Sequence, residues 1–271
     1  ADLSHLKVIS ISGVDRLTWL HDVTTQHLSE LSPGVWVDVM VLDPRGHVEH
    51  QFLLVDDGST SWAVVAPDYV EGLLAYLTKM IFTRQVEVRD ASADFVVLRA
   101  PGVPTDLGGP YALVPRSELD EMKKAFDAHA MQVGMWALDA LRVAAGRPRI
   151  GFDTDHKSIP NELGVLGGAV HMNKGCYRGQ ETVAKVHNLG HPPRRLVLLH
   201  LDGSGHEIPP AGSEIYLAES PDGAAAEDGR NQTARGKITS VQQHYEMGPI
   251  ALALVSRSVP EDAELVVRTE H

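Results

Sequence analysis

The sequence predicts an α+β fold over residues 1–190, followed by an all-β domain over residues 191–271. In the first part, β-branched runs alternate with turn signals, and apolar stripes of helical spacing lie between them. After Pro192-Pro193 the sequence changes to short apolar runs at regular spacing, which is typical of a small barrel or sandwich. We therefore expect helices and an antiparallel meander first, and a small C-terminal β-barrel last.

The elements of the first part follow from these patterns. The meander is predicted over residues 35–42, 47–55 and 61–66, with the turn signal Asp43-Pro44-Arg45-Gly46 between its first two strands. Further strands are predicted over residues 8–11, 85–88 and 95–98. Helices are predicted over residues 15–28, 67–82, 118–130 and 135–145. Trp19 and Trp136 lie in helical stripes, so we expect both in the core.

The remaining segments are a loop region and a strand-rich end. Residues 147–190 contain many Gly, Pro and Asn, which predicts a structured loop region that carries a site. The C-terminal strands are predicted over residues 196–201, 214–217, 237–241, 250–255 and 264–268. The polar stretch over residues 218–234 is predicted to be a hairpin loop.

Composition limits the classes of function. Of the 271 residues, 43% are hydrophobic and 22% charged, which is ordinary for a soluble globular protein. No run reaches the roughly 18 apolar residues that cross a membrane, and the first residues do not resemble a signal peptide. A net charge of −12 argues against direct nucleic-acid binding. The single cysteine, Cys176, excludes an internal disulfide and a multi-cysteine metal site, which fits a cytoplasmic location.

The segment from Asn173 to Glu181 carries most of the chemistry. It places a cation, a thiol, a phenol, an amide and a carboxylate close together, with two glycines that permit tight turns. From the residue types alone, this segment is either a functional site or a loop with a structural role.

Lys174-Gly175-Cys176-Tyr177 followed by Gly179-Gln180-Glu181 resembles the signature of the YgfZ-type proteins, in the superfamily of the glycine-cleavage aminomethyltransferase GcvT. Shorter stretches also resemble this superfamily: Ser12-Gly13-Val14-Asp15, Thr24-Thr25, Leu42 to Gly46, Leu141-Arg142, Phe152-Asp153 and Ile159 to Glu162. The resemblance implies a ring of α/β subdomains around a central cavity that holds tetrahydrofolate. The two interleaved subdomains would comprise residues 1–48 with 139–190, and residues 49–138.

The resemblance implies a tetrahydrofolate-binding accessory protein for iron–sulfur cluster assembly or repair, with iron–sulfur client proteins as partners. Glu162 matches a pterin-facing glutamate of the transferase relatives, and a carboxylate can accept hydrogen bonds from the pterin edge. Arg194 and the adjacent Arg195 are candidates for the folate tail carboxylates by charge. Tyr177 is either a folate contact or a core anchor.

The other signature residues also leave alternatives open. Gln180 and Glu181 would contact folate or stabilise the loop. Cys176 and Lys174 are the candidate catalytic residues, because a nearby lysine favours the reactive thiolate. Cys176 is a reactive thiol, a transient iron ligand or a buried small apolar side chain. Lys174 holds an anion or pairs with Glu181.

The alternative function is a folate-dependent aminomethyl or one-carbon transferase, and a further alternative is a scaffold module without folate. The transferases resemble this chain but carry an acidic pair after the glycine turn, where this sequence has Gly46-His47-Val48-Glu49-His50. The missing pair favours the accessory protein and leaves the question of catalysis open. We expect Glu49 and His50 to be an exposed strand pair.

Overall fold

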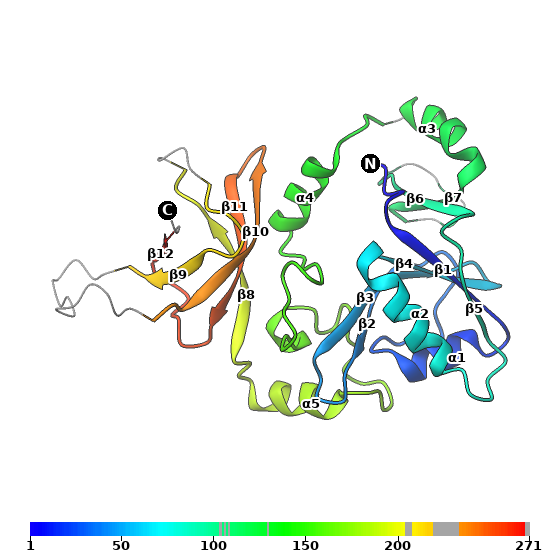
Figure 1. Cartoon of the computed structure of the whole chain (residues 1–271), viewed down its shortest axis with the longest axis horizontal. Helices are drawn as coiled ribbons and strands as arrows, with labels where there is room; N and C mark the ends of the chain where they lie inside the picture. The colour runs from blue at the N-terminus through cyan, green and yellow to red at the C-terminus, as the bar shows by residue number, and fades with distance from the viewer. Residues whose placement is uncertain are drawn as a thin grey trace. The chain divides into compact units, whose positions relative to one another are not determined.

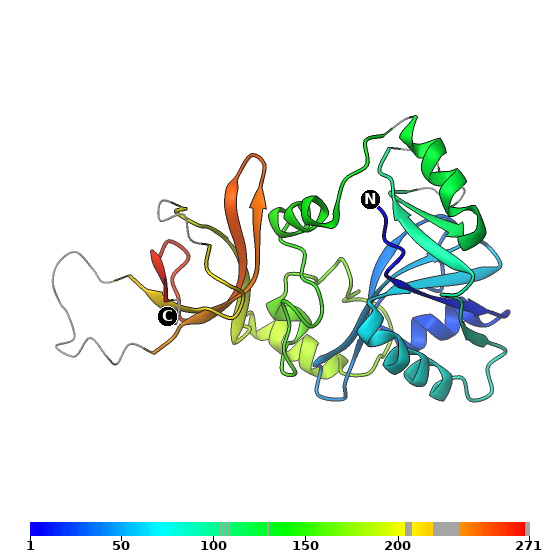
Figure 2. The same cartoon turned by 45° about the horizontal axis from the view of Figure 1, so that its top comes forward.

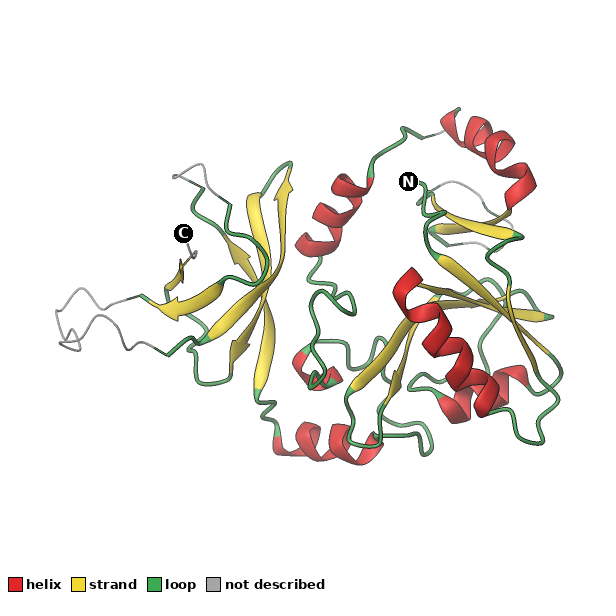
Figure 3. Cartoon of the chain, viewed as in Figure 1, coloured by secondary structure: helices red, strands yellow, loops and turns green. Residues whose placement is uncertain are grey.

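The computed structural model describes residues 1–102, 105, 107, 109–128, 130–203, 208–218 and 233–268. The fold is mixed α/β, as predicted (Figure 3). The chain forms two compact units, which we call the first unit (Ala1–Met135 with Val165–Ala184) and the second unit (Trp136–Gly164 with Lys185–His271). The subdomain boundaries expected from the resemblance stay a prediction.

The first unit is built on an antiparallel five-stranded sheet in the order β2-β3-β4-β1-β5 (Figure 1). Its strands are β1 (Lys7–Ser12), β2 (Val37–Leu42), β3 (Val48–Asp56), β4 (Thr60–Val65) and β5 (Glu87–Asp90). A second sheet pairs β6 (Phe95–Arg99) with β7 (Tyr111–Pro115), and the helices are α1 (Arg16–Val23), α2 (Val70–Lys79) and α3 (Leu119–Asp127). The predicted meander over residues 35–66 is therefore confirmed.

The core of the first unit lies between one face of the five-stranded sheet and the helices α1 and α2 (Figure 2). Alternate strand residues such as Ile9 and Ile11 point to this face, as expected for a half-buried strand. Trp19 and Leu20 of α1 and Leu73 of α2 fill the same cluster, so the predicted burial of Trp19 is confirmed.

Helix α1 is shorter than predicted, because it ends at Val23 and not near residue 28. Thr24 adopts an extended conformation, and its hydroxyl donates to the Leu20 carbonyl over 2.7 Å. Thr25 then donates its backbone N–H to the Met40 carbonyl of β2 over 3.0 Å. The chain after α1 is therefore held in an extended form beside the sheet.

The second unit contains a five-stranded antiparallel sheet in the order β12-β9-β10-β11-β8. Its strands are β8 (Arg194–His200), β9 (Glu214–Leu217), β10 (Gly236–His244), β11 (Gly248–Ser256) and β12 (Leu265–Arg268). Helix α4 (Met135–Ala144) packs on it through Val143, which joins Ile250 and Leu252 in a buried cluster. In the described residues β12 and β8 are the two edges of this sheet, so the closed barrel is not confirmed.

Several predictions about individual elements were wrong or incomplete. Trp136 is 87% exposed, because it lies in the first turn of α4, whereas the residues of this helix that join the buried cluster with the sheet are Val143 and Ala144 in its last turn. Strand β7 and helix α5 (Gln180–Leu189) were not predicted. Residues 219–232 of the predicted hairpin loop lie outside the described residues.

No helix in the described ranges has the length and apolar character needed to cross a membrane.

Candidate functional site

The Lys174 side chain is an internal anchor of the signature segment. It is only 7% exposed, and its ammonium group donates to the backbone carbonyls of His21, Thr24 and Gln26. These carbonyls lie where α1 ends, and the negative end of a helix dipole favours a cation. Burial lowers the pKa of Lys174 to about 8. The three acceptors match the three N–H groups of an ammonium, so neither an anion nor Glu181 is needed to explain the position of Lys174.

Further hydrogen bonds join the segment after α1 to the residues that precede Lys174. The buried Thr25 hydroxyl donates to the Ala169 carbonyl over 2.7 Å, and the Gln26 amide donates to the Gly168 carbonyl. The backbone N–H of His171 donates to the Thr25 carbonyl over 2.9 Å. The resemblance of Thr24-Thr25 to the superfamily thus has a structural explanation, because this segment binds the residues that lead into the signature segment.

Arg178 attaches the signature to strand β3. Its guanidinium donates to both carboxylate oxygens of Glu49, over 2.7 and 3.3 Å, which is the two-pronged geometry that arginine and a carboxylate favour. The guanidinium carbon lies 5.7 Å from the centre of the Tyr76 ring on α2. Glu49 and His50 are each half-buried, and the ring centres of His50 and Tyr76 lie 6.3 Å apart. The expectation that Glu49 and His50 form an exposed strand pair was therefore wrong.

Gly179 is required by a close approach between the signature and the turn after β2. Its φ is +80°, and a β-carbon there would lie 2.5 Å from the Asp43 carbonyl oxygen and 2.9 Å from the Gly46 α-carbon. Only glycine meets both conditions without displacement of the turn. The signature segment and the turn from Asp43 to Gly46, which lie far apart in the sequence, are therefore in direct contact.

Between these anchors, Cys176 is exposed and Tyr177 is buried. The interpretation of Cys176 as a buried apolar side chain was therefore wrong. Burial raises the pKa of Tyr177 to about 12, and its ring centre lies 5.3 Å from the Lys174 ammonium. Gln180 and Glu181 begin α5, and the Gln180 N–H donates to the Tyr177 carbonyl over 3.2 Å. Their contacts with folate, like that of Tyr177, stay a prediction.

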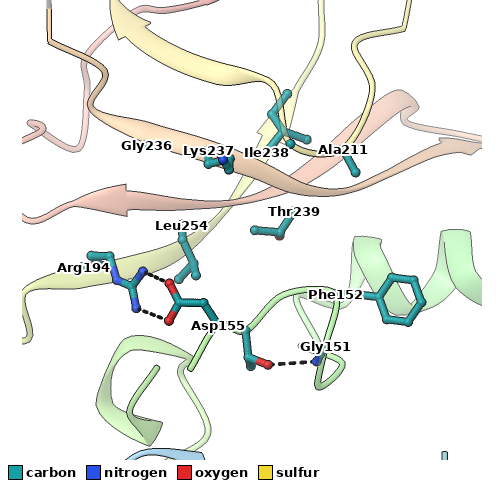
Figure 4. Close-up of a pocket in the computed structure, with 12 residues that line it drawn as sticks. Gly151, Phe152, Asp155, Arg194, Ala211, Gly236, Lys237, Ile238, Thr239 and Leu254 are labelled. Atoms are coloured by element: carbon teal, nitrogen blue, oxygen red, sulfur yellow. Dashed lines mark hydrogen bonds and ion pairs between the residues drawn. The ribbon is translucent and has the colours of Figure 1, made fainter. Parts of the chain in front are cut away.

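Glu162 and Arg194 form an ion pair in the second unit. The Glu162 side chain is 1% exposed, and each of its oxygens accepts a hydrogen bond of 2.9 Å from Arg194. The Ile159 N–H donates to the same carboxylate over 3.3 Å. Arg194 also donates to both oxygens of Asp155, over 2.6 and 3.1 Å (Figure 4). Hydrogen bonds from Arg194 lower the pKa of Asp155, and those to Glu162 and then Asp155 raise the pKa of Arg194.

A second buried carboxylate orders the loop beside this ion pair. Asp153 is fully buried and accepts hydrogen bonds from Arg142, from the Arg149 N–H and from the hydroxyls of Thr239 and Ser240. This arrangement connects two of the short matches, around Arg142 and Asp153, to strand β10.

A pocket of about 580 Å³ in the second unit was not predicted from the sequence (Figure 4). Asp155, Arg194, Lys237 and Leu254 are among the residues that line it. Phe152 and Arg194, which the sequence had singled out, are among its lining residues, but its walls come from β8, β10, β11 and two separate loops, so no local pattern indicated the pocket. Arg195 was the other arginine named for the folate tail, and it donates to the Val259 carbonyl over 2.7 Å.

No family model matches the chain, but individual proteins do. A putative chloroplastic transferase of Arabidopsis thaliana is 24% identical over 74% of this chain and 55% of its own length, so the chain spans about half of that protein. The mitochondrial iron–sulfur cluster assembly factor IBA57 homologue of Mycosarcoma maydis is 25% identical over 88% of this chain and 68% of its own length. The tRNA-modifying protein YgfZ of Edwardsiella ictaluri is 29% identical over 48% of this chain and 37% of its own length.

Among solved structures, the glycine cleavage system aminomethyltransferase T of Bartonella henselae matches 99% of this chain and 81% of its own chain, with a TM-score of 0.79 and 18% identity. The fold is therefore that of the aminomethyltransferases. Together with the relatives named YgfZ and IBA57, this match supports the likeness of the chain to the YgfZ/GcvT-like superfamily. The resemblance found in the signature segment is confirmed.

If Lys174 is an anchor, Lys174→Met should lower the free energy of unfolding by about 2–4 kcal/mol, because it leaves buried carbonyls without a donor. Cys176→Ala is the matched control two positions away, and it should change stability by less than about 0.5 kcal/mol because the thiol is exposed. Urea unfolding of the three proteins measures both effects. Equal stabilities of the lysine variant and the wild type would contradict the anchor.

The contact at Gly179 predicts that Gly179→Ala destabilises the protein by about 2 kcal/mol more than Gly102→Ala. Both glycines have a positive φ, at +80° and +78°, but a β-carbon at Gly102 would meet nothing within 4 Å. The comparison therefore isolates the clash with the turn from the strain of the left-handed backbone. Similar melting temperatures of the two variants would show that the turn yields without cost.

The Arg194–Asp155 pair predicts a contribution to stability that depends on pH. Because the pKa of Asp155 is lowered in the folded protein, this contribution is present above the unfolded pKa, about 3.9, and is lost as the pH falls below it. Asp155→Asn should therefore flatten the loss of stability below about pH 4. Glu261→Gln, at an exposed position of the same unit, should follow the wild type. An Asp155→Asn profile parallel to that of the wild type would refute the pairing.

Proposed function

We propose that this protein is a tetrahydrofolate-binding accessory factor for the assembly or repair of iron–sulfur proteins. The relatives support this function, because one is named as an iron–sulfur cluster assembly factor and another as YgfZ. The observation that carries the proposal is the buried Glu162 carboxylate, oriented by Arg194, at the position that matches the pterin-facing glutamate. The ring of subdomains and the closed C-terminal barrel remain part of this proposal.

The donor set fits a folate. A carboxylate offers about four lone-pair sites, and the hydrogen bonds to Glu162 use three of them, two from Arg194 and one from Ile159. One site is left for an N–H of the pterin amino-pyrimidine edge. Arg194 fixes the direction of the Glu162 carboxylate. Because the pterin and the tail carboxylates are at opposite ends of a folate, this position gives Arg194 a role at the pterin end in this proposal. Tyr177, Gln180 and Glu181 are the other folate contacts in this proposal.

The surroundings of Glu49 support an accessory role over an aminomethyl transfer. Glu49 is the acidic residue nearest to the position of the transferase acidic pair, and both of its oxygens accept hydrogen bonds from Arg178. A carboxylate held in this way is poorly placed to take a proton from a substrate amine. Arg178 lies in the signature segment, at the position between Tyr177 and Gly179 that the signature leaves variable, so this contact comes from a residue that does not itself carry the resemblance.

The partners and the location belong to the same proposal. Iron–sulfur client proteins are the proposed partners, and the exposed Cys176 is a signature side chain available to them. The proposed location is the cytoplasm, whereas two relatives have names that place those proteins in chloroplasts and mitochondria.

Titration with tetrahydrofolate under anaerobic conditions tests the proposal. We expect saturable binding by calorimetry, and Glu162→Gln should weaken it about ten- to a hundredfold, because it removes a charge-assisted hydrogen bond. Glu261→Gln is the matched control and should bind like the wild type. Absence of saturable binding at high micromolar ligand would remove folate from the proposal.

An assay of methylene-tetrahydrofolate formation from an aminomethyl donor separates the accessory factor from a transferase. We expect no turnover above background, because Glu49 is held by Arg178. Robust turnover that is lost in Glu49→Gln would establish the transferase function instead.

A further inference from the structure

Three histidines form a contact cluster beside the Lys174 anchor. His27 lies between His21 and His171, with ring centres 4.8 and 5.1 Å apart and rings inclined by 75° in both pairs. His21 belongs to α1, His27 to the segment after it, and His171 to the segment that leads into the signature. Among the described residues no three or more histidine, cysteine or acidic side chains are grouped so that they could hold a metal ion.

The backbone around the cluster requires two of the rings to be neutral. The Leu28 N–H donates to Nδ1 of His21 over 3.3 Å, and the Asn173 N–H donates to Nδ1 of His171 over 3.3 Å. Each bond needs a lone pair on Nδ1, whereas an imidazolium carries hydrogen on both nitrogens. Protonation of either ring therefore removes the bond and turns two donors toward each other.

The surrounding charges also disfavour protonation of His21. Burial lowers the pKa of His21, and the Lys174 ammonium, His27 and His171 lower it further. Asp22 is the acidic group that opposes this shift, but its carboxylate already pairs with Arg84 over 2.9 Å. The carbonyl of His21 is itself an acceptor for Lys174, so a charge on this ring would lie beside the anchor.

We propose that His21, in contact through His27 with His171, forms a pH-sensitive latch that holds the signature segment on the end of α1 when the His21 ring is neutral and loosens it when this ring is protonated. The latch rests on the proposed function only in that it regulates the loop assigned to the site. Two hydrogen bonds would loosen: the one from the His171 N–H to the Thr25 carbonyl, and the one from the Gln26 amide to the Gly168 carbonyl. The loop that contains Cys176 comes next in the sequence.

The direction of the effect follows from the lowered pKa. The pKa of His21 is lowered when the signature segment is docked on the end of α1, so the form with the segment released binds a proton more tightly. Docking is therefore unaffected above the ordinary histidine pKa of about 6.5 and weakens as the pH falls below it.

Hydrogen–deuterium exchange of the ligand-free full chain at pH 7.5 and pH 5.5 tests the latch. After correction for intrinsic exchange, the protection factors of peptides over residues 168–178 should be about three- to tenfold lower at pH 5.5 than at pH 7.5, which is the effect of one lost hydrogen bond. Peptides of β3 and β4 serve as the reference. A His21→Gln/His171→Gln variant should show no such difference, because the glutamine oxygen still accepts the backbone N–H but does not titrate. His5→Gln, at an exposed histidine of the same unit, should behave like the wild type.

Two results would overturn the latch: unchanged protection of the wild type at pH 5.5, or an equal loss in the double variant. If the double variant does not melt cooperatively, His21→Gln alone should reduce the pH effect, and an undiminished effect counts against the latch. The exchange experiment contains no folate, so failure of the tetrahydrofolate titration leaves its outcome untouched. Conversely, a protein that binds folate but shows pH-independent exchange retains its proposed function and lacks the latch.

Discussion

The buried ammonium of Lys174 is the interaction on which the signature segment depends. A buried cation is tolerated only when its hydrogen-bond donors are satisfied, and here three backbone carbonyls around the end of α1 satisfy them. Because those carbonyls come from both sides of Val23, the helix end and the following residues are held in one geometry. Arg178 and Gly179 attach the other side of the loop to the β2–β3 hairpin, which leaves Cys176 exposed between two fixed points.

The second unit follows the same rule with carboxylates in place of a cation. Glu162 is paired with Arg194, and Asp153 is surrounded by donors from α4, its own loop and β10. Removal of one partner from such a network leaves a buried charge unpaired, which costs more than the pair contributes. The short matches to the superfamily therefore mark residues that order the loops, while the proposed folate contacts use the acceptor capacity that remains on Glu162.

Patterns in the sequence predicted the elements whose cause is local. The meander over residues 35–66 followed from β-branched runs around Asp43 to Gly46, and the burial of Trp19 from helical spacing. The same spacing was misleading for Trp136, because periodicity does not show how far along α4 the sheet extends. The partners of Lys174 are backbone carbonyls, which have no sequence signal, and Glu49 lies 129 positions from Arg178. The pairs that define the site therefore required the fold.

The most direct test of the account is the pKa of Lys174, measured from the ¹³Cε chemical shift of the ligand-free protein as a function of pH. An ammonium buried against backbone carbonyls should titrate at about 8. A solvated lysine that points out of the loop should titrate near its ordinary value, about 10.4. A midpoint of about 8 that is unchanged by Cys176→Ala would support the anchor, and a midpoint near 10.4 would contradict it.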